Sequence, residues 1–397
     1  MKTLILFLVF IFTINVFSQN SWQSKSDLLG NFRSNASSFV VNGKAYIIGG
    51  GNGFGSAFND VWEYDPVSDQ WTQKSDFPGT GRAYSISFSI GSKGYFGIGA
   101  YFNGNSWVQL SDFWEYNSLT DTWLQKSSFP PGPRWMAASF EINGKGYIGT
   151  GSDSNGTYPD LWEYDPLTDL WIQKANFPFY RFGCVGFSLN GKGYFGLGTY
   201  CGVAYQEFYQ YDPLSDSWIQ KASISGIGRW HAVSLTLNSR AYVGTGVDIL
   251  TNKLNDFYEY NDGNDTWTQK ADFGGGLRYS AIGFSINNKG YIGTGYGNNF
   301  CKDLWEYSPD ITLGYNLFNN RVEDINLYPI PTNSSLNITS IENIEMIKII
   351  NDIGVVLFQN IVNRNNFITD FSLFSDGVYY VHIITCKGET IKKVIKQ

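Results

Sequence analysis

Short runs of alternating apolar and polar residues, separated by Gly-rich turns, recur along most of the chain. In one stretch, Met136 to Ile142 and Gly146 to Thr150 flank the pair Asn143-Gly144, which favours a tight hairpin. Two further runs follow, Asp160 to Tyr164 and Trp171 to Lys174. Because side chains alternate in every run, the pattern predicts units of four strands and an all-β fold.

The unit repeats at a nearly constant interval. Tryptophans in equivalent positions stand 47 to 52 residues apart, at Trp71, Trp123, Trp171, Trp218 and Trp267. This period suits one four-stranded blade of a β-propeller, and a blade cannot bury both of its faces alone. We therefore expect the units to stack in a ring.

Two strand motifs give the number of blades. The motif Trp-x-x-Lys begins at Trp22, Trp71, Trp123, Trp171, Trp218 and Trp267, and the motif aromatic-x-Tyr begins at Trp62, Trp114, Trp162, Tyr209, Tyr258 and Trp305. Both motifs occur six times, but the first Trp motif precedes the first unit and the last unit has none of its own. We therefore expect residues 22–25 to complete the sixth blade, which leaves no open sheet edge.

The repeated motifs resemble the kelch repeat family over residues 22–310. The resemblance rests on the Gly-rich second strand, Gly49-Gly50-Gly51 in the first unit, and on the seven-residue spacing between Tyr64 and Trp71. It implies a six-bladed kelch-type β-propeller. Since kelch-like propellers include enzymes, glycan binders and scaffold proteins, the fold leaves the function open.

The repeat ends near residue 310, and an Asn-rich stretch, residues 311–320, is expected to be a linker. Residues 321–397 then form a second domain, predicted to be a small antiparallel β-sandwich of the immunoglobulin-like kind. Its expected strands are Leu336 to Ile338, Met346 to Ile350, Val355 to Phe358, Val378 to Thr385 and Ile391 to Ile395.

This second domain resembles the type A C-terminal sorting domain of the type IX secretion system of Bacteroidetes. The matching residues include Pro329, Pro331, Gly354, Gly377, Tyr379 and Lys393, although Ile330 stands where the family usually has Asn. The resemblance implies that the secretion machinery is a partner and that the protein is secreted or reaches the outer cell surface. The alternative is an ordinary accessory sandwich.

The start of the chain and its composition agree with export. Lys2 precedes the apolar run Leu4 to Val16 and a cleavage-like Val16-Phe17-Ser18, so residues 1–18 are predicted to be a signal peptide. No second apolar run is long enough to span a membrane, so no integral segment is expected after signal cleavage. The net charge of −7, without a basic block, argues against nucleic acid as a partner.

Each unit carries one arginine nine residues before its first hairpin turn: Arg33, Arg82, Arg134, Arg181, Arg229 and Arg278. Such a ring could bind an anion. However, each unit also has an acid at the start of its third strand: Asp60, Asp112, Asp160, Glu207, Asp256 and Asp303. We therefore favour structural ion pairs over an anion site.

Residues that break the repeat indicate a binding face. Three of the 13 tryptophans, Trp107, Trp135 and Trp230, lie outside the repeated positions, in or beside loops of one propeller face. The candidate ligand residues are Trp107, Trp135, Trp230, His231, Phe102, Tyr158, Tyr200 and Tyr279, and the same loops also hold Tyr296 and Phe300. Exposed aromatic rings beside Asn, Ser and Gly suit a glycan or an extracellular protein. The alternative is that some of these rings pack against neighbouring loops.

Catalytic signals are sparse. The chain has two histidines, His231 and His382, too few for a galactose-oxidase-like copper site or a zinc site built on several histidines. We therefore predict no metal, no cofactor and no catalytic residue, with His231 on an inner strand facing the same side as Arg229. The alternative is a carbohydrate-active enzyme resembling the kelch-fold sialic acid mutarotases or epimerases, with Asp153 or Asp248 as its acid.

Two further expectations concern the state of the protein. The four cysteines, Cys184, Cys201, Cys301 and Cys386, are too scattered for a disulfide framework and are expected to be buried free thiols. We therefore predict a monomeric, exported binding protein.

Overall fold

A computed structural model describes residues 20–53, 55–309, 325–351, 356–385 and 388–397. The predicted signal peptide, the predicted linker and Gly354 lie outside these residues. The chain divides into two compact units, Met1–Asp310 and Ile311–Gln397, and each is described by itself. Where the structure describes the chain, it contains no helix that is long and apolar enough to span a bilayer.

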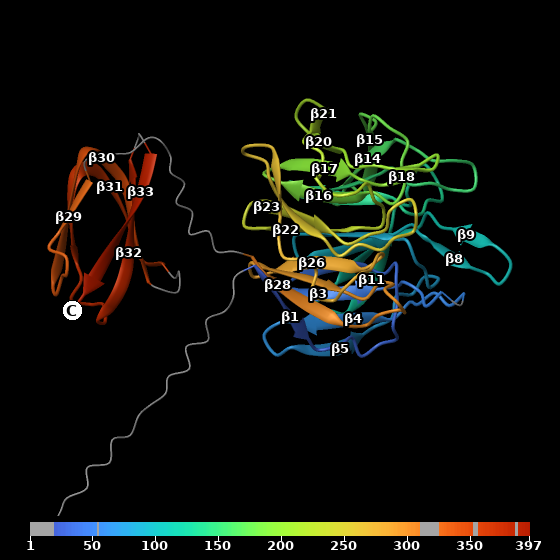
Figure 1. The fold of residues 1–397 in the computed structure, drawn as a ribbon, viewed down its shortest axis with the longest axis horizontal. Helices are drawn as coiled ribbons and strands as arrows, with labels where there is room; N and C mark the ends of the chain where they lie inside the picture. Colours follow the sequence, from blue (N-terminus) through green and yellow to red (C-terminus); the bar gives the residue numbers. More distant parts are fainter. Residues whose placement is uncertain (1–19, 54, 310–324, 352–355, 386–387) are drawn as a thin grey trace, which may run out of the picture. The chain divides into compact units, whose positions relative to one another are not determined.

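The first unit contains, within its described residues, six sheets of four antiparallel strands (Figure 1). Listed blade by blade, the strands are β2 (Ser37–Val41), β3 (Lys44–Ile48), β4 (Val61–Asp65) and β5 (Gln70–Lys74); β6 (Ile86–Ile90), β7 (Lys93–Gly97), β10 (Phe113–Asn117) and β11 (Thr122–Lys126); β12 (Ala138–Ile142), β13 (Lys145–Gly149), β14 (Leu161–Asp165) and β15 (Leu170–Lys174); β16 (Val185–Leu189), β17 (Lys192–Gly196), β20 (Phe208–Asp212) and β21 (Ser217–Lys221); β22 (Val233–Leu237), β23 (Arg240–Gly244), β24 (Phe257–Asn261) and β25 (Thr266–Gln269); and β26 (Ile282–Ile286), β27 (Lys289–Gly293), β28 (Leu304–Ser308) and β1 (Ser21–Lys25). The first strand of each blade contacts the first strands of both neighbours, so these strands surround the axis. The fold is a six-bladed propeller.

The sixth blade is built from both ends of the propeller sequence. Strand β1 pairs with β28 along its whole length, which places Trp22 opposite Tyr307. In the first blade the hydroxyl of Tyr64 donates to Asp69, five residues further along the chain, at 2.8 Å. In the sixth blade the hydroxyl of Tyr307 donates instead to Asn20, at 2.9 Å, so the N-terminal segment supplies the group that the last repeat lacks.

Glycine in the second strand of a blade makes room for a ring from the blade before it. A Cβ atom placed on Gly146 would lie 2.1 Å from the Phe88 ring, and one placed on Gly94 would lie 2.2 Å from Phe39. The interior between blades is therefore close-packed, and a larger side chain at this position has nowhere to go.

We expect Gly146→Val to lower the free energy of unfolding by about 3 kcal/mol, because the added carbons must displace Phe88 from the core. Gly156→Ala serves as the control, since a Cβ there meets no atom within 4 Å. Urea denaturation of the full chain measures both. An equal effect of the two substitutions would contradict this account of blade packing.

The repeated arginines are buried and paired. All six are at most 2% exposed. In the second blade, Arg82 donates to the carbonyl oxygen of Ile98 at 3.2 Å and to both carboxylate oxygens of Asp112 at 2.5 and 2.8 Å. Equivalent pairs are Arg33 with Asp60, Arg134 with Asp160, Arg181 with Glu207, Arg229 with Asp256 and Arg278 with Asp303. Each guanidinium therefore bonds within its own blade, and none is left for an anion on the axis.

Pairing with arginine lowers the pKa of two of these carboxyl groups. Burial by itself raises the pKa of Asp112, but hydrogen bonds from Arg82 and from Trp114 outweigh it and hold the pKa below the ordinary value. The same balance lowers the pKa of Asp60 beside Arg33. Each of these carboxylates is therefore charged at neutral pH and stabilises the fold above its ordinary pKa.

Asp160→Ala should lower the free energy of unfolding by about 3 kcal/mol, because it leaves the Arg134 charge buried without its carboxylate. Glu207→Ala should cost less, about 2 kcal/mol, because it also leaves a buried guanidinium, Arg181, without its carboxylate but removes a weaker contact. The Glu207 side chain is 34% exposed and meets Arg181 through one contact of 3.2 Å. Thermal denaturation of the two variants compares them, and a larger loss for Glu207→Ala would overturn this ranking.

A closed circle of backbone hydrogen bonds surrounds the axis. Its six members stand two positions after the arginines: Asn35, Tyr84, Met136, Gly183, His231 and Ser280. The amide of each donates to the carbonyl of the corresponding residue in the preceding blade at 2.9 to 3.2 Å, and all six have left-handed backbones with φ of 52° to 65°. This backbone is incompatible with a strand, so β12 begins at Ala138 and the expected strand start at Met136 is wrong.

The second unit is a small antiparallel β domain. Its strands are β29 (Ile325–Tyr328), β30 (Ser335–Asn351), β31 (Val356–Asp370), β32 (Gly377–Thr385) and β33 (Gly388–Lys396). The predicted strands Leu336 to Ile338 and Met346 to Ile350 are halves of one strand, β30, and β31 runs far past the predicted end at Phe358. Register shifts between Thr339 and Met346 interrupt the pairing of β30 with β31 between its two halves.

Both halves of β30 contribute to one hydrophobic core. The first half pairs with β29, and the second half pairs with β32. The core comprises Ile325, Leu336, Ile338, Ile344, Ile347, Ile349, Phe367, Phe371, Tyr379, Val381, Ile383 and Val394. The described residues of this unit thus form one five-stranded sheet whose longest strand pairs with two sets of partners.

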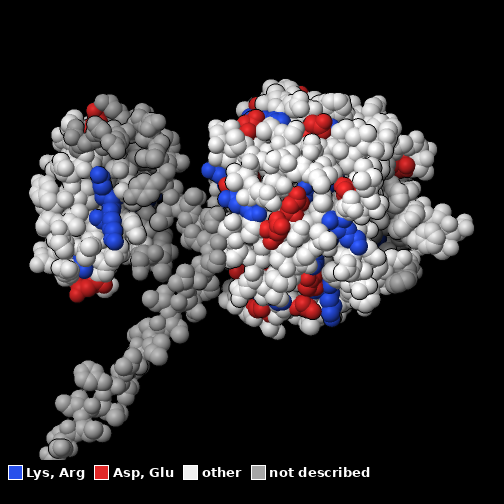
Figure 2. Space-filling view, viewed as in Figure 1, with Lys and Arg blue, Asp and Glu red and all other residues white. Residues whose placement is uncertain are grey.

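Charge is dispersed over the propeller face shown in Figure 2, where basic and acidic side chains lie beside one another. Ion pairs of the propeller include Lys44 with Glu63 at 2.7 Å and Lys145 with Glu163 at 2.6 Å. This face therefore lacks the continuous basic patch with which proteins bind phosphate backbones.

Candidate functional site

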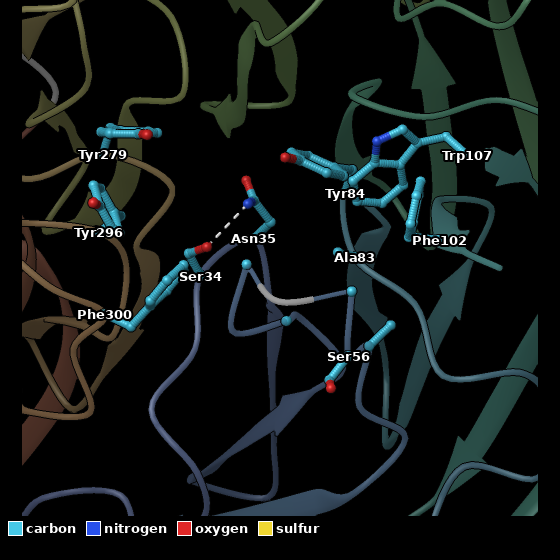
Figure 3. Close-up of a pocket in the computed structure, with 14 residues that line it drawn as sticks. Ser34, Asn35, Ser56, Ala83, Tyr84, Phe102, Trp107, Tyr279, Tyr296 and Phe300 are labelled. Carbon is cyan, nitrogen blue, oxygen red and sulfur yellow. Dashed lines mark hydrogen bonds between the residues drawn. The ribbon is translucent and has the colours of Figure 1, made fainter. Parts of the chain in front are cut away.

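A pocket with a volume of about 770 Å³ lies over the first blade. It is lined by small residues of that blade and by aromatic residues of the second and sixth blades (Figure 3). The lining residues are Ser34, Asn35, Gly51, Gly53, Gly55, Ser56, Ala57, Ala83, Tyr84, Phe102, Trp107, Tyr279, Tyr296 and Phe300. No Asp, Glu, Lys, Arg or His is among these residues, so no lining side chain is charged, although the Lys253 ammonium lies 4.7 Å from the centroid of the Tyr296 ring.

One aromatic wall comes from the second blade. Trp107 contacts Phe102, Tyr84 and Trp135, with ring centroids 5.8, 5.7 and 5.4 Å away. Trp135 lies behind this wall, against both Trp107 and Tyr84. The other wall comes from the sixth blade, where Tyr296 contacts Tyr279 at 5.6 Å and Phe300 at 4.8 Å.

Phe102 and Trp107 of the second-blade wall belong to the loop between the second and third strands of that blade. This loop is longer than the corresponding loop of any other blade and forms a hairpin. Strands β8 (Ala100–Phe102) and β9 (Trp107–Gln109) pair so that Phe102 lies opposite Trp107, and the hairpin projects from the propeller (Figure 1). The side chain of Asn103 accepts hydrogen bonds from the amides of Asn105 and Ser106, both at 2.9 Å, and so holds the turn. Trp107 is 42% exposed, and its ring is available to a ligand.

Polar groups lie between the two walls. Figure 3 shows Ser34 and Asn35 between the Tyr279 and Tyr84 sides, and the Asn35 amide donates to the Ser34 hydroxyl at 3.1 Å. Ser56 lies on the first-blade side of the pocket. The arrangement of apolar rings around a few hydrogen-bonding groups is that of a small-molecule site.

The predicted ligand residues divide into three groups. Trp107, Phe102 and Tyr279 line the pocket, and Trp135 supports its wall. His231 adjoins it through Tyr84, at 5.8 Å, and Trp230 lies one ring further away, 4.4 Å from His231.

Tyr158 and Tyr200 lie outside the pocket lining. Tyr158 covers the Arg134 guanidinium at 4.2 Å and donates to Asp153 at 2.9 Å, while Tyr200 stacks on Tyr180 at 5.9 Å. Both therefore pack against residues of neighbouring loops, Arg134 and Tyr180, as in the alternative stated above. Sequence reasoning missed Tyr84, whose signal was its place two residues after a repeated arginine, where the side chain differs in every blade.

His231 occupies a different place from the predicted one. It precedes β22 instead of lying on it, and its φ of 52° removes the alternation that would set it on the side of Arg229. Its ring packs against Trp230, Tyr84 and Tyr279. Because this packing removes water from the imidazole, the pKa of His231 falls to about 4, and the ring is neutral at physiological pH.

The acids considered for catalysis serve their own loops. Asp153 accepts hydrogen bonds from the amides of Asn155 and Gly156, and Asp248 accepts from those of Leu250 and Asn252. These bonds outweigh burial and lower the pKa of both carboxyls, which suits turn caps better than proton donors. Neither acid lines the pocket.

Neither grouped metal-ligating side chains nor the cysteine thiols form a second candidate site among the described residues. Among the described residues, no three His, Cys, Asp or Glu side chains are grouped to hold a metal ion. Cys184, Cys201 and Cys301 are free thiols. Burial raises the pKa of Cys184 to about 11, whereas Cys201 is exposed, so the expectation of burial is wrong for that thiol. Cys386 lies outside the described residues.

The predicted sorting residues lie in several parts of the second unit. Pro329 and Pro331 are exposed after β29, Gly377 begins β32, and Lys393 is exposed on β33. Tyr379 is buried in the core, where its hydroxyl donates to the carbonyl oxygen of Ser375 at 2.7 Å. The tyrosine therefore has a structural role, and the prolines and lysine form part of the surface.

Comparison with known proteins agrees with both units. Residues 33–78 match the family model of the Kelch motif, and residues 326–397 match the model described as a secretion system C-terminal sorting domain. The chain is a kelch-type propeller with a type IX sorting domain. The sorting domain directs export, so this kelch protein is secreted or displayed at the cell surface.

Among the solved structures that match is one described as the structure of YjhT. It has a TM-score of 0.60 and 18% sequence identity, and the match covers 69% of this chain and 94% of that chain. This likeness supports the fold of the propeller. No curated protein matches the chain.

We expect His231 to make stability depend on pH. Its pKa is about 4 in the folded state and near 6.5 when unfolded, so between these values the unfolded state binds more protons and stability falls as pH falls. Because the ring keeps some exposure, the loss between pH 6.5 and 4.5 should be about 1 to 2 kcal/mol.

His231→Phe should lack this part of the pH dependence. Urea unfolding at several pH values measures the difference between the two proteins. Parallel curves for wild type and variant across the interval would contradict a partly buried, neutral imidazole.

Proposed function

We propose that this exported kelch protein binds a neutral saccharide in the pocket between Trp107 and Tyr296. The observation that carries the proposal is a concave site without charged lining side chains, with aromatic rings on two sides and hydroxyl and amide groups between them. Sugar rings offer C–H faces that pack on aromatic rings and hydroxyls that bond to Ser and Asn side chains. The sequence also predicts an alternative partner, an extracellular protein, which would insert a side chain into this pocket.

The lack of charged lining side chains favours a neutral sugar over an acidic one. A carboxylate placed there would lose its hydration without gaining a cationic partner among the lining residues. The mutarotase-like alternative finds no support in the lining either, because opening and closing a sugar ring calls for groups that move protons.

Trp107→Ala should weaken saccharide binding at least about 10-fold, because it removes the exposed ring of one wall. Binding of neutral glycans to the full chain is measured on an array and then by titration calorimetry. Tyr180→Ala is the matched control, since Tyr180 is an exposed aromatic residue outside the pocket. Loss of binding in both variants, or in neither, would refute the pocket as the site.

An array without any bound glycan would refute the saccharide proposal itself. Exchange of sugar anomers or epimers, followed by NMR, would identify an enzyme instead. A partner captured by the wild-type chain and released by Trp107→Ala would identify protein binding.

A further inference from the structure

A line of rings leaves the pocket and crosses the propeller axis. Trp107 contacts Tyr84 at 5.7 Å, Tyr84 contacts His231 at 5.8 Å, and His231 contacts Trp230 at 4.4 Å. Beyond Trp230 the line ends on Phe182, whose ring meets Trp230 edge-on at 5.9 Å. Trp107 and Tyr84 belong to the second blade and His231 precedes the fifth, so the line joins opposite blades of the ring.

The middle of this line lies over the circle of left-handed residues. A cavity of about 110 Å³ there is lined by Asn35, Tyr84, His231 and Ser280, among others. The Ser280 side chain is 6% exposed, and its hydroxyl has no hydrogen-bond partner in the structure. A buried hydroxyl without a partner is unfavourable, and rotation toward a ligand hydroxyl in the cavity would remove that penalty.

At the far end of the line, Trp230 offers a second ring surface. Its side chain is partly exposed, and it is one of the three tryptophans that depart from the repeat. Gly183 lies beside it, and a Cβ there would approach the indole to 3.2 Å. Gly183 therefore packs against the indole on that side, and a larger residue there would crowd it, so only the partly exposed remainder of the Trp230 ring can meet a ligand.

We propose that the kelch propeller binds an oligosaccharide of three or more neutral units along this line, with the pocket as a first subsite and Trp230 as a second. The inference rests on the saccharide proposal above and adds the length and direction of the ligand. The four rings follow one another at centroid distances of 4.4 to 5.8 Å, so the path from Trp107 to Trp230 is longer than one pyranose unit. The His231 imidazole is neutral, so it places no charge in the middle of the proposed binding path.

The test uses the full chain and neutral homo-oligosaccharides of glucose, mannose, galactose, xylose and N-acetylglucosamine, each from one to six units. For any series that binds, we expect the affinity to rise about 10-fold or more between two and four units and then to level off. Equal affinity for two and four units would overturn the second subsite. If no series binds, the saccharide proposal fails, and this inference fails with it.

Variants separate the two subsites. Trp230→Ala should reduce binding of the four-unit ligand about 10-fold and leave the two-unit ligand within about twofold, whereas Trp107→Ala should weaken both. Trp230→Phe, which keeps a ring, should restore most of the loss. An unchanged melting temperature shows that the variant is folded, and equal affinity of Trp230→Ala and wild type for four units would overturn the inference while leaving the pocket in place.

Discussion

The buried arginine of each blade is the constraint on which the propeller depends. Its side chain joins the second and third strands of its own blade, and its backbone joins the blade before it. In the case of Arg82, the amide donates to the Phe58 carbonyl at 3.1 Å, and the carbonyl accepts from Gly50 at 2.8 Å. A guanidinium inaccessible to water requires a carboxylate and fixed acceptors, so every blade must supply the same set.

This constraint separates the residues that hold the ring from those that can vary. The loops after the second strands are free to differ, because the arginine fixes the backbone on either side of them. In the first blade this loop contains Gly51, Gly53 and Gly55, which leave the space that the aromatic residues of the neighbouring blades enclose. The pocket thus exists because a blade with small residues stands between two with large ones.

The sequence predicts part of this site. Trp107, Phe102 and Tyr279 could be found because they depart from the repeat or lie in its loops. Tyr84 was missed, because no consensus residue marks it as an exception, although the varying side chain two residues after each repeated arginine was a signal. The direction in which Tyr158 and Tyr200 point depends on Arg134 and on Tyr180. Alternation in the second unit likewise predicts strands but does not show that β30 continues through its bulge.

The sequence by itself determined the propeller, its six blades and the pairing of each arginine with an acid, because these features are local and each blade repeats them. Only the tertiary structure decided which loops meet. Tyr84 and His231 are almost 150 residues apart in the sequence. Their side chains touch because the six blades form a closed propeller, which Trp22 completes by pairing opposite Tyr307. The left-handed circle around the axis also belongs to the closed ring, since each of its hydrogen bonds needs the neighbouring blade in place.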